Sequence, residues 1–150
     1  MERRDFIRKS VLATAAFTIV PRHVLGGAGF TAPSDQITKA IVGVGGIGYG
    51  HHFDREGRLV AVCDVDRLHL ERAVKRAGEG VSAYSDFREL LLQKDIDIVH
   101  IATPPHWHGT MSVMAAEAGK DIWCEKPMTR TIGEGKRVIE AVQRHGRMFR

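Results

Sequence analysis

The sequence has no stretch of about 20 apolar residues, the length that a helix needs to cross a bilayer. Near the N-terminus the most apolar segment, Val11 to Val20, is short and is interrupted by Thr14 and Thr18. We therefore expect no stable membrane span. At 150 residues, of which 43% are apolar, the chain is long enough for one domain with a core of its own.

The sequence also lacks an excess of one charge outside its first 32 residues. Of the formal net charge of +4, residues 1–32 account for +3, with five basic and two acidic residues. Residues 33–150 hold 17 basic and 16 acidic residues and carry only +1. No basic surface is implied for this part, so we expect no nucleic-acid partner.

The basic residues at the N-terminus are arranged as in an export signal. The segment Arg3-Arg4-Asp5-Phe6-Ile7 precedes the apolar stretch, and small residues from Gly26 to Gly29 follow it. This order is typical of secretion signals, and Arg-Arg-x-Phe-Ile resembles the twin-arginine signal that exports folded proteins. We therefore expect residues 1–32 to be a leader and the protein to be periplasmic or otherwise extracytoplasmic. A basic N-terminal helix on a cytoplasmic protein is the alternative.

The most informative stretch runs from Lys39 to Asp66. An apolar run leads into Gly43-Val44-Gly45-Gly46-Ile47-Gly48, which fits the G-x-G-x-x-G pattern of dinucleotide-binding turns. In this pattern the first glycine allows the tight turn, the second lets a pyrophosphate approach the backbone, and the third lets the following helix pack on the sheet. The N–H groups at the start of that helix bind phosphate. A glycine-rich turn without a ligand is the competing interpretation.

A carboxylate follows at the expected distance. The second apolar run, Leu59 to Val62, ends in Cys63 and Asp64, and Asp64 lies 21 residues after Gly43. An acidic residue about 20 positions on binds the adenosine ribose hydroxyls. A carboxylate repels a 2′-phosphate and favours NAD, whereas the nearby Arg67 favours NADP. NAD is the predicted cofactor, with NADP as the alternative.

From Lys39 onward the apolar periodicity alternates between strands and helices, which predicts a doubly wound parallel α/β sheet, the Rossmann fold, over residues 33–150. The predicted strands cover about 38–44, 59–64, 81–84, 96–102 and 121–124, and a sixth opens at 148–150. The predicted helices cover about 46–55, 67–77, 86–93, 106–118 and 132–145. Asp66 can cap the helix over 67–77, and Thr131 and Glu134 form a capping box for the last helix.

The chain has only two cysteines, Cys63 and Cys124. They end the predicted second and fifth strands, which the Rossmann order 3-2-1-4-5-6 separates by three strand spacings, or about 14 Å. This distance is beyond the reach of a disulfide. We expect both thiols to be free and largely buried.

Ligands of open α/β sheets bind outside the carboxyl ends of the strands. The segments that follow the predicted strands are "GVGGIG", "CDVD", "ATPPHWH" and "CEKPM". Together they resemble the Gfo/Idh/MocA family of NAD(P)-dependent oxidoreductases, over residues 38–150. The resemblance implies a Rossmann domain that binds NAD(P) and substrates that are sugars, inositols or related polyols. The cofactor-binding residues that we predict are Gly43, Gly45, Gly46, Ile47, Gly48, Asp64, Thr103, Pro104, His108, Glu125 and Lys126.

The resemblance implies a catalytic role for Lys126, the lysine of the family's "EKP" segment, beside the nicotinamide and the substrate hydroxyl. A lysine near the cationic ring, or one that is buried, loses its proton more readily and can then accept or relay the hydroxyl proton. Bracing of the loop or of a phosphate is the alternative. By the same resemblance His108 lines the cofactor crevice, with a structural role at the helix start as the alternative. Glu125 pairs with Lys126 or orients a cofactor hydroxyl.

The histidines do not form a metal-binding pattern. His106 and His108 are two positions apart on a predicted helix, so they do not share a face. The adjacent His51 and His52 are equally unsuited, and we expect no metal. We expect Trp107 and Trp123 to be packing residues.

Family members carry a second domain that supplies most of the substrate pocket, and it is absent from this chain. The chain ends inside an expected strand, so we expect it to be the N-terminal part of a longer oxidoreductase and to be inactive alone. The alternatives are a non-catalytic dinucleotide-binding fragment and part of a glycosidase that uses bound NAD.

Overall fold

The computed structural model describes residues 31–32 and 35–150, with the backbone alone at positions 51 and 52. Contacts divide the chain into Met1–Gln36 and a folded unit, Ile37–Arg150. The expected twin-arginine motif and apolar stretch lie outside the described residues. Within the described part, no helix has the length and hydropathy needed to cross a membrane.

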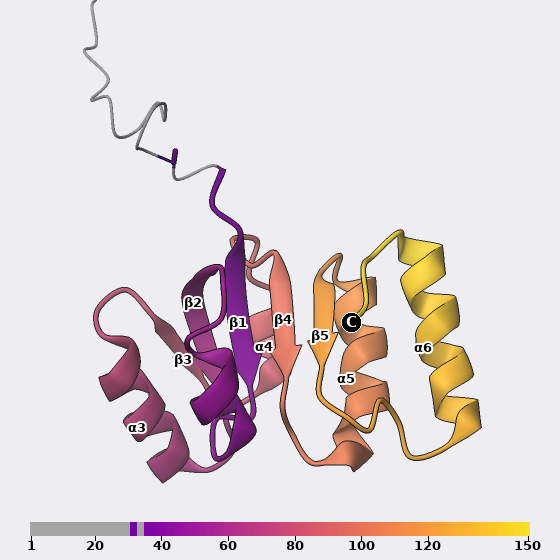
Figure 1. Cartoon of the computed structure of the whole chain (residues 1–150), viewed down its shortest axis with the longest axis horizontal. Helices are drawn as coiled ribbons and strands as arrows, with labels where there is room; N and C mark the ends of the chain where they lie inside the picture. The colour runs from indigo at the N-terminus through magenta and orange to yellow at the C-terminus, as the bar shows by residue number, and fades with distance from the viewer. Residues whose placement is uncertain (1–30, 33–34) are drawn as a thin grey trace, which may run out of the picture. The chain divides into compact units, whose positions relative to one another are not determined.

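A five-stranded sheet with the order β3-β2-β1-β4-β5 forms the centre of the folded unit (Figure 1). All four neighbouring pairs are parallel. The strands are β1 (Thr38–Val42), β2 (Arg58–Cys63), β3 (Ser82–Tyr84), β4 (Ile98–Ile101) and β5 (Asp121–Cys124). The predicted fold class is therefore confirmed. The expected opening of a sixth strand at 148–150 is also seen: Phe149 forms a parallel bridge with Ile122 of β5, and Met148 and Arg150 share backbone hydrogen bonds with that strand.

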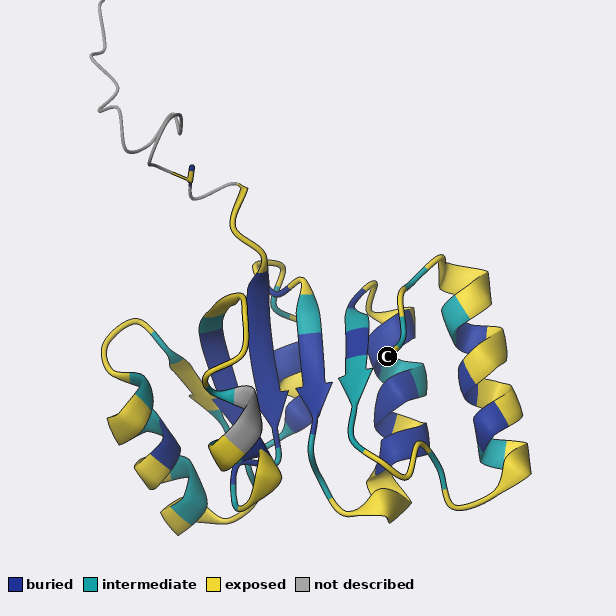
Figure 2. Ribbon diagram, viewed as in Figure 1, coloured by how far each residue is buried: buried dark blue, intermediate teal, exposed yellow. Residues whose placement is uncertain are grey.

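Helices cover both faces of the sheet. On one face α4 (Phe87–Leu91), α5 (Pro105–Glu117) and α6 (Ile132–His145) contribute Leu90, Met111, Ala115 and Ala141 to the larger core cluster. On the other face α3 (Arg67–Ala77) packs Ala73 against Ile41 and Val62. The buried residues of α6 alternate with exposed ones, as its amphipathic sequence predicts (Figure 2).

Side chains predicted to start helices do so. Asp66 accepts hydrogen bonds from the N–H groups of Leu68 and His69 at the start of α3. Thr131 accepts one from the N–H of Glu134 at the start of α6, whereas the Glu134 carboxylate accepts from the N–H of Arg130. In the usual capping box the glutamate accepts from the N–H of the capping residue itself, here Thr131, whereas Glu134 accepts from the residue before it. These caps fix where both helices begin.

The largest departure from the predicted elements follows the glycine loop. The expected helix over 46–55 is replaced by a π-helical turn, η2 (Gly48–His52), that has no capping side chain. Two glycines within these five residues disfavour a regular helix. The segment is held by its aromatic side chains instead: the Arg76 guanidinium lies 4.7 Å from the ring centre of Tyr49 and 4.6 Å from that of Phe53.

Both cysteines are free, as predicted. Cys63 ends β2 and Cys124 ends β5, and β1 and β4 lie between these strands. Burial raises the pKa of the Cys63 thiol to about 12 and that of the Cys124 thiol to about 11. Both groups are therefore protonated, unreactive thiols at neutral pH.

Candidate functional site

A cavity of about 760 Å³ opens at the carboxyl edge of the sheet, where β1, β2, β3 and β4 end. Its walls come from the glycine loop, from the residues after β2 and β3, and from the start of α5. This is the edge at which open α/β sheets bind ligands. The predicted site residues that line it are Gly43, Gly45, Gly46, Ile47, Asp64, Thr103 and Pro104.

The glycine loop can take its shape only because two of its positions lack a side chain. Gly43 has φ +89°, and a Cβ there would lie 2.7 Å from the carbonyl oxygen of Ala102. A Cβ at Gly48 would lie 1.9 Å from the carbonyl oxygen of Gly43. Both neighbours are backbone atoms that cannot move aside. The third glycine thus provides the close packing that the motif predicted, although a π-helical turn follows it in place of the expected helix.

The loop leaves its middle open to the cavity. At Gly46 an added Cβ would meet no atom within 4 Å. The backbone at this position is therefore accessible to a ligand, as a phosphate-binding loop requires. The open backbone at Gly46 is therefore compatible with binding of the pyrophosphate of a dinucleotide.

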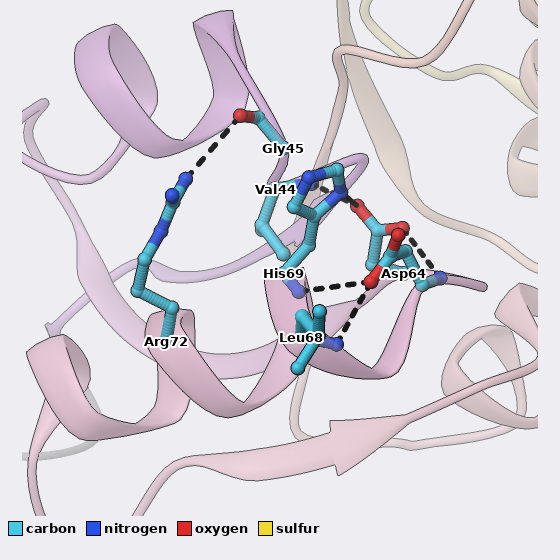
Figure 3. Close-up of polar contacts among 7 residues, drawn as sticks. Val44, Gly45, Asp64, Leu68, His69 and Arg72 are labelled. Atoms are coloured by element: carbon cyan, nitrogen blue, oxygen red, sulfur yellow. Dashed lines mark hydrogen bonds and ion pairs between the residues drawn. The ribbon is translucent and has the colours of Figure 1, made fainter.

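Asp64 is held in place by two backbone groups (Figure 3). Its Oδ2 accepts a hydrogen bond of 2.8 Å from the N–H of Val44, and its Oδ1 accepts one of 2.9 Å from the N–H of Asp66. Each carboxylate oxygen has room for a second hydrogen bond, and the side chain is 10% exposed at the cavity wall. The carboxylate can therefore accept bonds from two adjacent hydroxyl groups without moving.

His69 is a cavity-lining residue that the sequence did not single out. Its ring lies against Gly45, where an added Cβ would be 2.6 Å from Nδ1, and the same Nδ1 lies 3.8 Å from Asp64 Oδ2. His69 lies in the first turn of α3, which begins shortly after Asp64. Side chains of a helix point toward its N-terminus, so this position could have indicated from the sequence that His69 lies near the strand ends. Arg67, which we expected to influence the cofactor preference, does not line the cavity but forms an ion pair of 3.3 Å with Glu71.

An apolar wall closes the cavity on the side of α4 and α5. Phe87 and Trp107 line it, with their ring centroids 6.3 Å apart in an edge-to-face arrangement, and Met111 lies beside them. Trp107 is 39% exposed, so it packs against Phe87 and also presents a ring surface to the cavity. Aromatic and aliphatic walls of this kind suit a flat heterocycle such as adenine.

His108 does not line this cavity and is only 1% exposed. Its Nε2 lies 2.7 Å from the carbonyl oxygen of Thr103, and its Nδ1 lies 2.8 Å from that of Pro127. The ring therefore bridges the loop after β4 and the loop after β5. A neutral imidazole donates to one of these carbonyls and a charged one to both. Its two possible roles, in lining the cofactor crevice and in the structure at the helix start, both remain predictions.

Glu125 and Lys126 follow β5 at the same edge of the sheet as Asp64, because β2 and β5 are parallel members of one sheet. The N–H of Glu125 donates to the carbonyl oxygen of Ile101, and the peptide bond between Lys126 and Pro127 is cis. Neither Glu125 nor Lys126 lines the cavity, and Lys126 is exposed rather than buried. The roles predicted for these residues, and for the other site residues, remain predictions.

No group of three histidine, cysteine or carboxylate side chains that could hold a metal ion occurs in the part of the chain that the structure describes. The side chains of His51 and His52 lie outside that part. The cavity instead offers a glycine loop, one anchored carboxylate and an apolar wall. This combination suits an organic ligand with phosphate and ribose groups.

Comparison with protein families gives a match over residues 37–150 to the Gfo/Idh/MocA family model, described as an oxidoreductase family with an NAD-binding Rossmann fold. Among curated proteins, "Glycosyl hydrolase family 109 protein 2" of Shewanella sp. (strain ANA-3) is 36% identical over 159 aligned positions. The alignment covers 89% of this chain and 35% of the relative. The chain thus spans about a third of the length of its curated relatives.

Solved structures give the same fold. The WlbA dehydrogenase from Bordetella pertussis, crystallised in complex with NADH and UDP-GlcNAcA, is 29% identical with a TM-score of 0.69 over 76% of this chain and 36% of that chain. The myo-inositol 2-dehydrogenase from Lactobacillus plantarum is 27% identical with a TM-score of 0.70, over 77% of this chain and 35% of that chain. Both similarities fall on the domain that contains the glycine loop and Asp64.

Proposed function

The chain belongs to the Gfo/Idh/MocA family of NAD-binding oxidoreductases, and on that premise we propose that it is the nucleotide-binding part of an enzyme that transfers a hydride between NAD and a hydroxyl group of a sugar, an inositol or a related polyol. The observation that carries the proposal is the anchored Asp64 carboxylate beside an open glycine loop. The substrate class is supported by the dehydrogenases with the same fold, one crystallised with NADH and a nucleotide sugar and one named for myo-inositol.

Different residues at this edge of the sheet would bind the adenosine end and the nicotinamide end of the cofactor. Asp64 would accept hydrogen bonds from the adenosine ribose hydroxyls, and the backbone at Gly45 and Gly46 would face the pyrophosphate. The apolar wall of Phe87 and Trp107 is suited to adenine. Thr103 and Pro104, which line the cavity after β4, would lie toward the nicotinamide end.

Lys126 has the role of proton acceptor or relay in this proposal. NAD, when bound, would supply the hydride acceptor; oxidation of the alcohol also releases a proton, which the unprotonated amine of Lys126 would accept at Nζ from the hydroxyl. The bridge that His108 forms between Thr103 and Pro127 would hold the loop of Lys126 beside the loop after β4. Precise placement of such a group accounts for a large part of a rate enhancement.

Turnover is tested in the protein that carries this chain, by following absorbance of reduced nicotinamide while sugars and polyols are screened with NAD. Lys126→Ala should abolish NAD reduction by the substrate so found and change the NAD dissociation constant by less than about threefold, because the lysine acts on the proton and not on cofactor affinity. Lys94→Ala, an exposed lysine ahead of β4, is the matched control and should leave turnover unchanged. Full turnover in the Lys126 variant would refute the assignment.

A second candidate is a glycosidase that uses bound NAD for transient oxidation. It is favoured by the curated relatives, which are named as glycosyl hydrolase family 109 proteins at up to 36% identity over the compared region. Release of a reducing sugar from a glycoside without net NAD reduction would support this candidate over the dehydrogenase. Tight NAD binding with neither reaction would support a non-catalytic dinucleotide-binding module.

Export by the twin-arginine route is part of the same proposal and rests on Arg3-Arg4-Asp5-Phe6-Ile7 and the apolar stretch after it. Residues 1–32 fused to a folded reporter should direct it to the periplasm. Replacing Arg3 and Arg4 together with lysine should keep the reporter in the cytoplasm. Cytoplasmic retention of the unaltered fusion would contradict the proposal.

A further inference from the structure

The ring of His69 occupies the space between the two groups that define the dinucleotide site. It contacts the second glycine of the loop, Gly45, and its Nδ1 is 3.8 Å from the ribose-binding carboxylate of Asp64 (Figure 3). A dinucleotide whose ribose reaches Asp64 and whose pyrophosphate reaches the glycine loop must therefore touch this ring. The side chain is 41% exposed, so it has room to adjust to a ligand.

The charges around the ring are dominated by carboxylates. Asp64 lies at the end of β2, and Asp66 caps α3 with its Oδ1 3.2 Å from the N–H of His69. On α3, Arg72 donates to the carbonyl oxygen of Gly45 at 3.4 Å and lies over the Tyr49 ring. With a neutral His69, this end of the cavity is therefore negative.

The other charged groups at the cavity largely cancel one another. Asp86 and Arg88 line it from α4 and form an ion pair of 3.1 Å with each other. Arg67 pairs with Glu71 outside the cavity. Among the residues that the structure describes along the cavity wall, His69 is thus the one histidine, a side chain that can be neutral or charged and so can alter the field at Asp64.

We propose that His69 is a specificity-determining residue that sets the choice between NAD and NADP by its charge. In its neutral form the ring bonds a ribose hydroxyl, and the unopposed Asp64 carboxylate disfavours a 2′-phosphate. In its charged form the ring offsets Asp64 and attracts that phosphate. Lower pH therefore shifts the preference toward NADP. The inference rests on dinucleotide binding and not on the proposed hydride transfer.

The test is the ratio of the dissociation constants of NADP and NAD, measured by isothermal titration with the 150-residue chain at about pH 6 and about pH 8. In the unaltered chain the ratio should fall by about tenfold more on acidification than it does in His69→Gln, as expected for one charge about 4 Å away in a partly exposed site. The 2′-phosphate itself titrates near pH 6. Because the free dinucleotide titrates in the same way in every measurement, the difference between the unaltered chain and the variant isolates the effect of the histidine on the bound form.

Two further variants sharpen the test. His69→Arg carries a permanent charge and should lower the ratio at about pH 8 by about tenfold, with no pH dependence beyond that of His69→Gln. His145→Gln, at the end of α6 and away from the cavity, is the matched control and should behave like the unaltered chain. Circular dichroism at each pH checks that the variants are folded.

The outcomes separate the inference from the proposed function. An equal pH dependence in the unaltered chain and in His69→Gln, or an unchanged ratio in His69→Arg, would overturn the role of His69 and leave dinucleotide binding intact. Binding of neither dinucleotide would overturn both. A ratio that falls on acidification only when His69 is present would support the inference.

Discussion

Replacing His108 with alanine should lower the free energy of unfolding by about 4 kcal/mol. The side chain is 1% exposed, and large-to-small substitutions at such sites cost about 2–5 kcal/mol. The ring also lies at hydrogen-bond distance from the carbonyl oxygens of Thr103 and Pro127, and a hydrogen bond donated to one of them contributes about 1 kcal/mol. A loss of this size is a large part of the stability of a domain, which is about 5–15 kcal/mol.

Urea unfolding followed by circular dichroism measures this loss, and two more variants divide it. His108→Phe keeps an aromatic ring in the core but donates to neither carbonyl oxygen, and a buried acceptor left unpaired costs about 1–3 kcal/mol, so this variant should cost about 2 kcal/mol. His145→Ala, an exposed histidine in the last turn of α6, should cost less than about 1 kcal/mol. Unfolding free energies within about 0.5 kcal/mol of the unaltered chain for both His108 variants would refute the reasoning.

Three further predictions concern the loop, a helix cap and the thiols. Gly48→Ala should lower the free energy of unfolding by more than about 2 kcal/mol, because its Cβ would lie 1.9 Å from the Gly43 carbonyl oxygen, whereas Gly46→Ala should leave stability nearly unchanged in the same urea titration. Hydrogen bonds from the N–H groups of His69 and Leu68 lower the pKa of Asp66, so the stabilisation by its charged form is present above the pKa of the unfolded chain and is lost as pH falls through the folded pKa. Asp66→Asn, which caps without titrating, should therefore lose less stability than the unaltered chain between about pH 6 and about pH 3, and equal losses would contradict the role of the cap. Because burial raises the pKa of Cys63 to about 12 and that of Cys124 to about 11, alkylation of the folded chain at about pH 8 should be at least about a hundredfold slower than that of free cysteine, and reaction at the free rate would show that the thiols are accessible.

Local sequence signals were sufficient for most of the fold. The alternation of strands and helices predicted the parallel sheet, because apolar periodicity reports which side of each element is buried. The strand order came from the Rossmann fold that this alternation and the glycine loop indicated. The caps at Asp66 and Thr131 were predictable because a capping side chain bonds to backbone groups two or three residues away. The position of Asp64 followed from its spacing to Gly43, since a strand, a turn and a helical segment of usual length lie between them.

The features that the sequence did not reveal depend on contacts between distant segments. The π-helical turn η2 is held by Arg76 against Tyr49 and Phe53, and no short-range pattern reports that packing. His108 is buried because its partners, the carbonyls of Thr103 and Pro127, lie on two different loops. His69 contacts Gly45, 24 positions earlier in the chain, only because α3 folds back beside the glycine loop. In each case the position of the side chain depends on contacts that form only in the tertiary structure.

The central claim is that Asp64, anchored by Val44 and Asp66, binds the ribose of NAD. Isothermal titration of NAD into the unaltered chain, Asp64→Asn and Asp121→Asn tests it most directly. Asp121 is the matched control because it also accepts a backbone hydrogen bond, from Met148, but lies at the start of β5 and thus at the opposite edge of the sheet. Asp64→Asn should weaken NAD binding by about 10- to 100-fold, the effect of losing a hydrogen bond to a charged group, and Asp121→Asn should leave it unchanged. NAD binding that is equally tight in the unaltered chain and in Asp64→Asn, or absent from the unaltered chain, would contradict the claim.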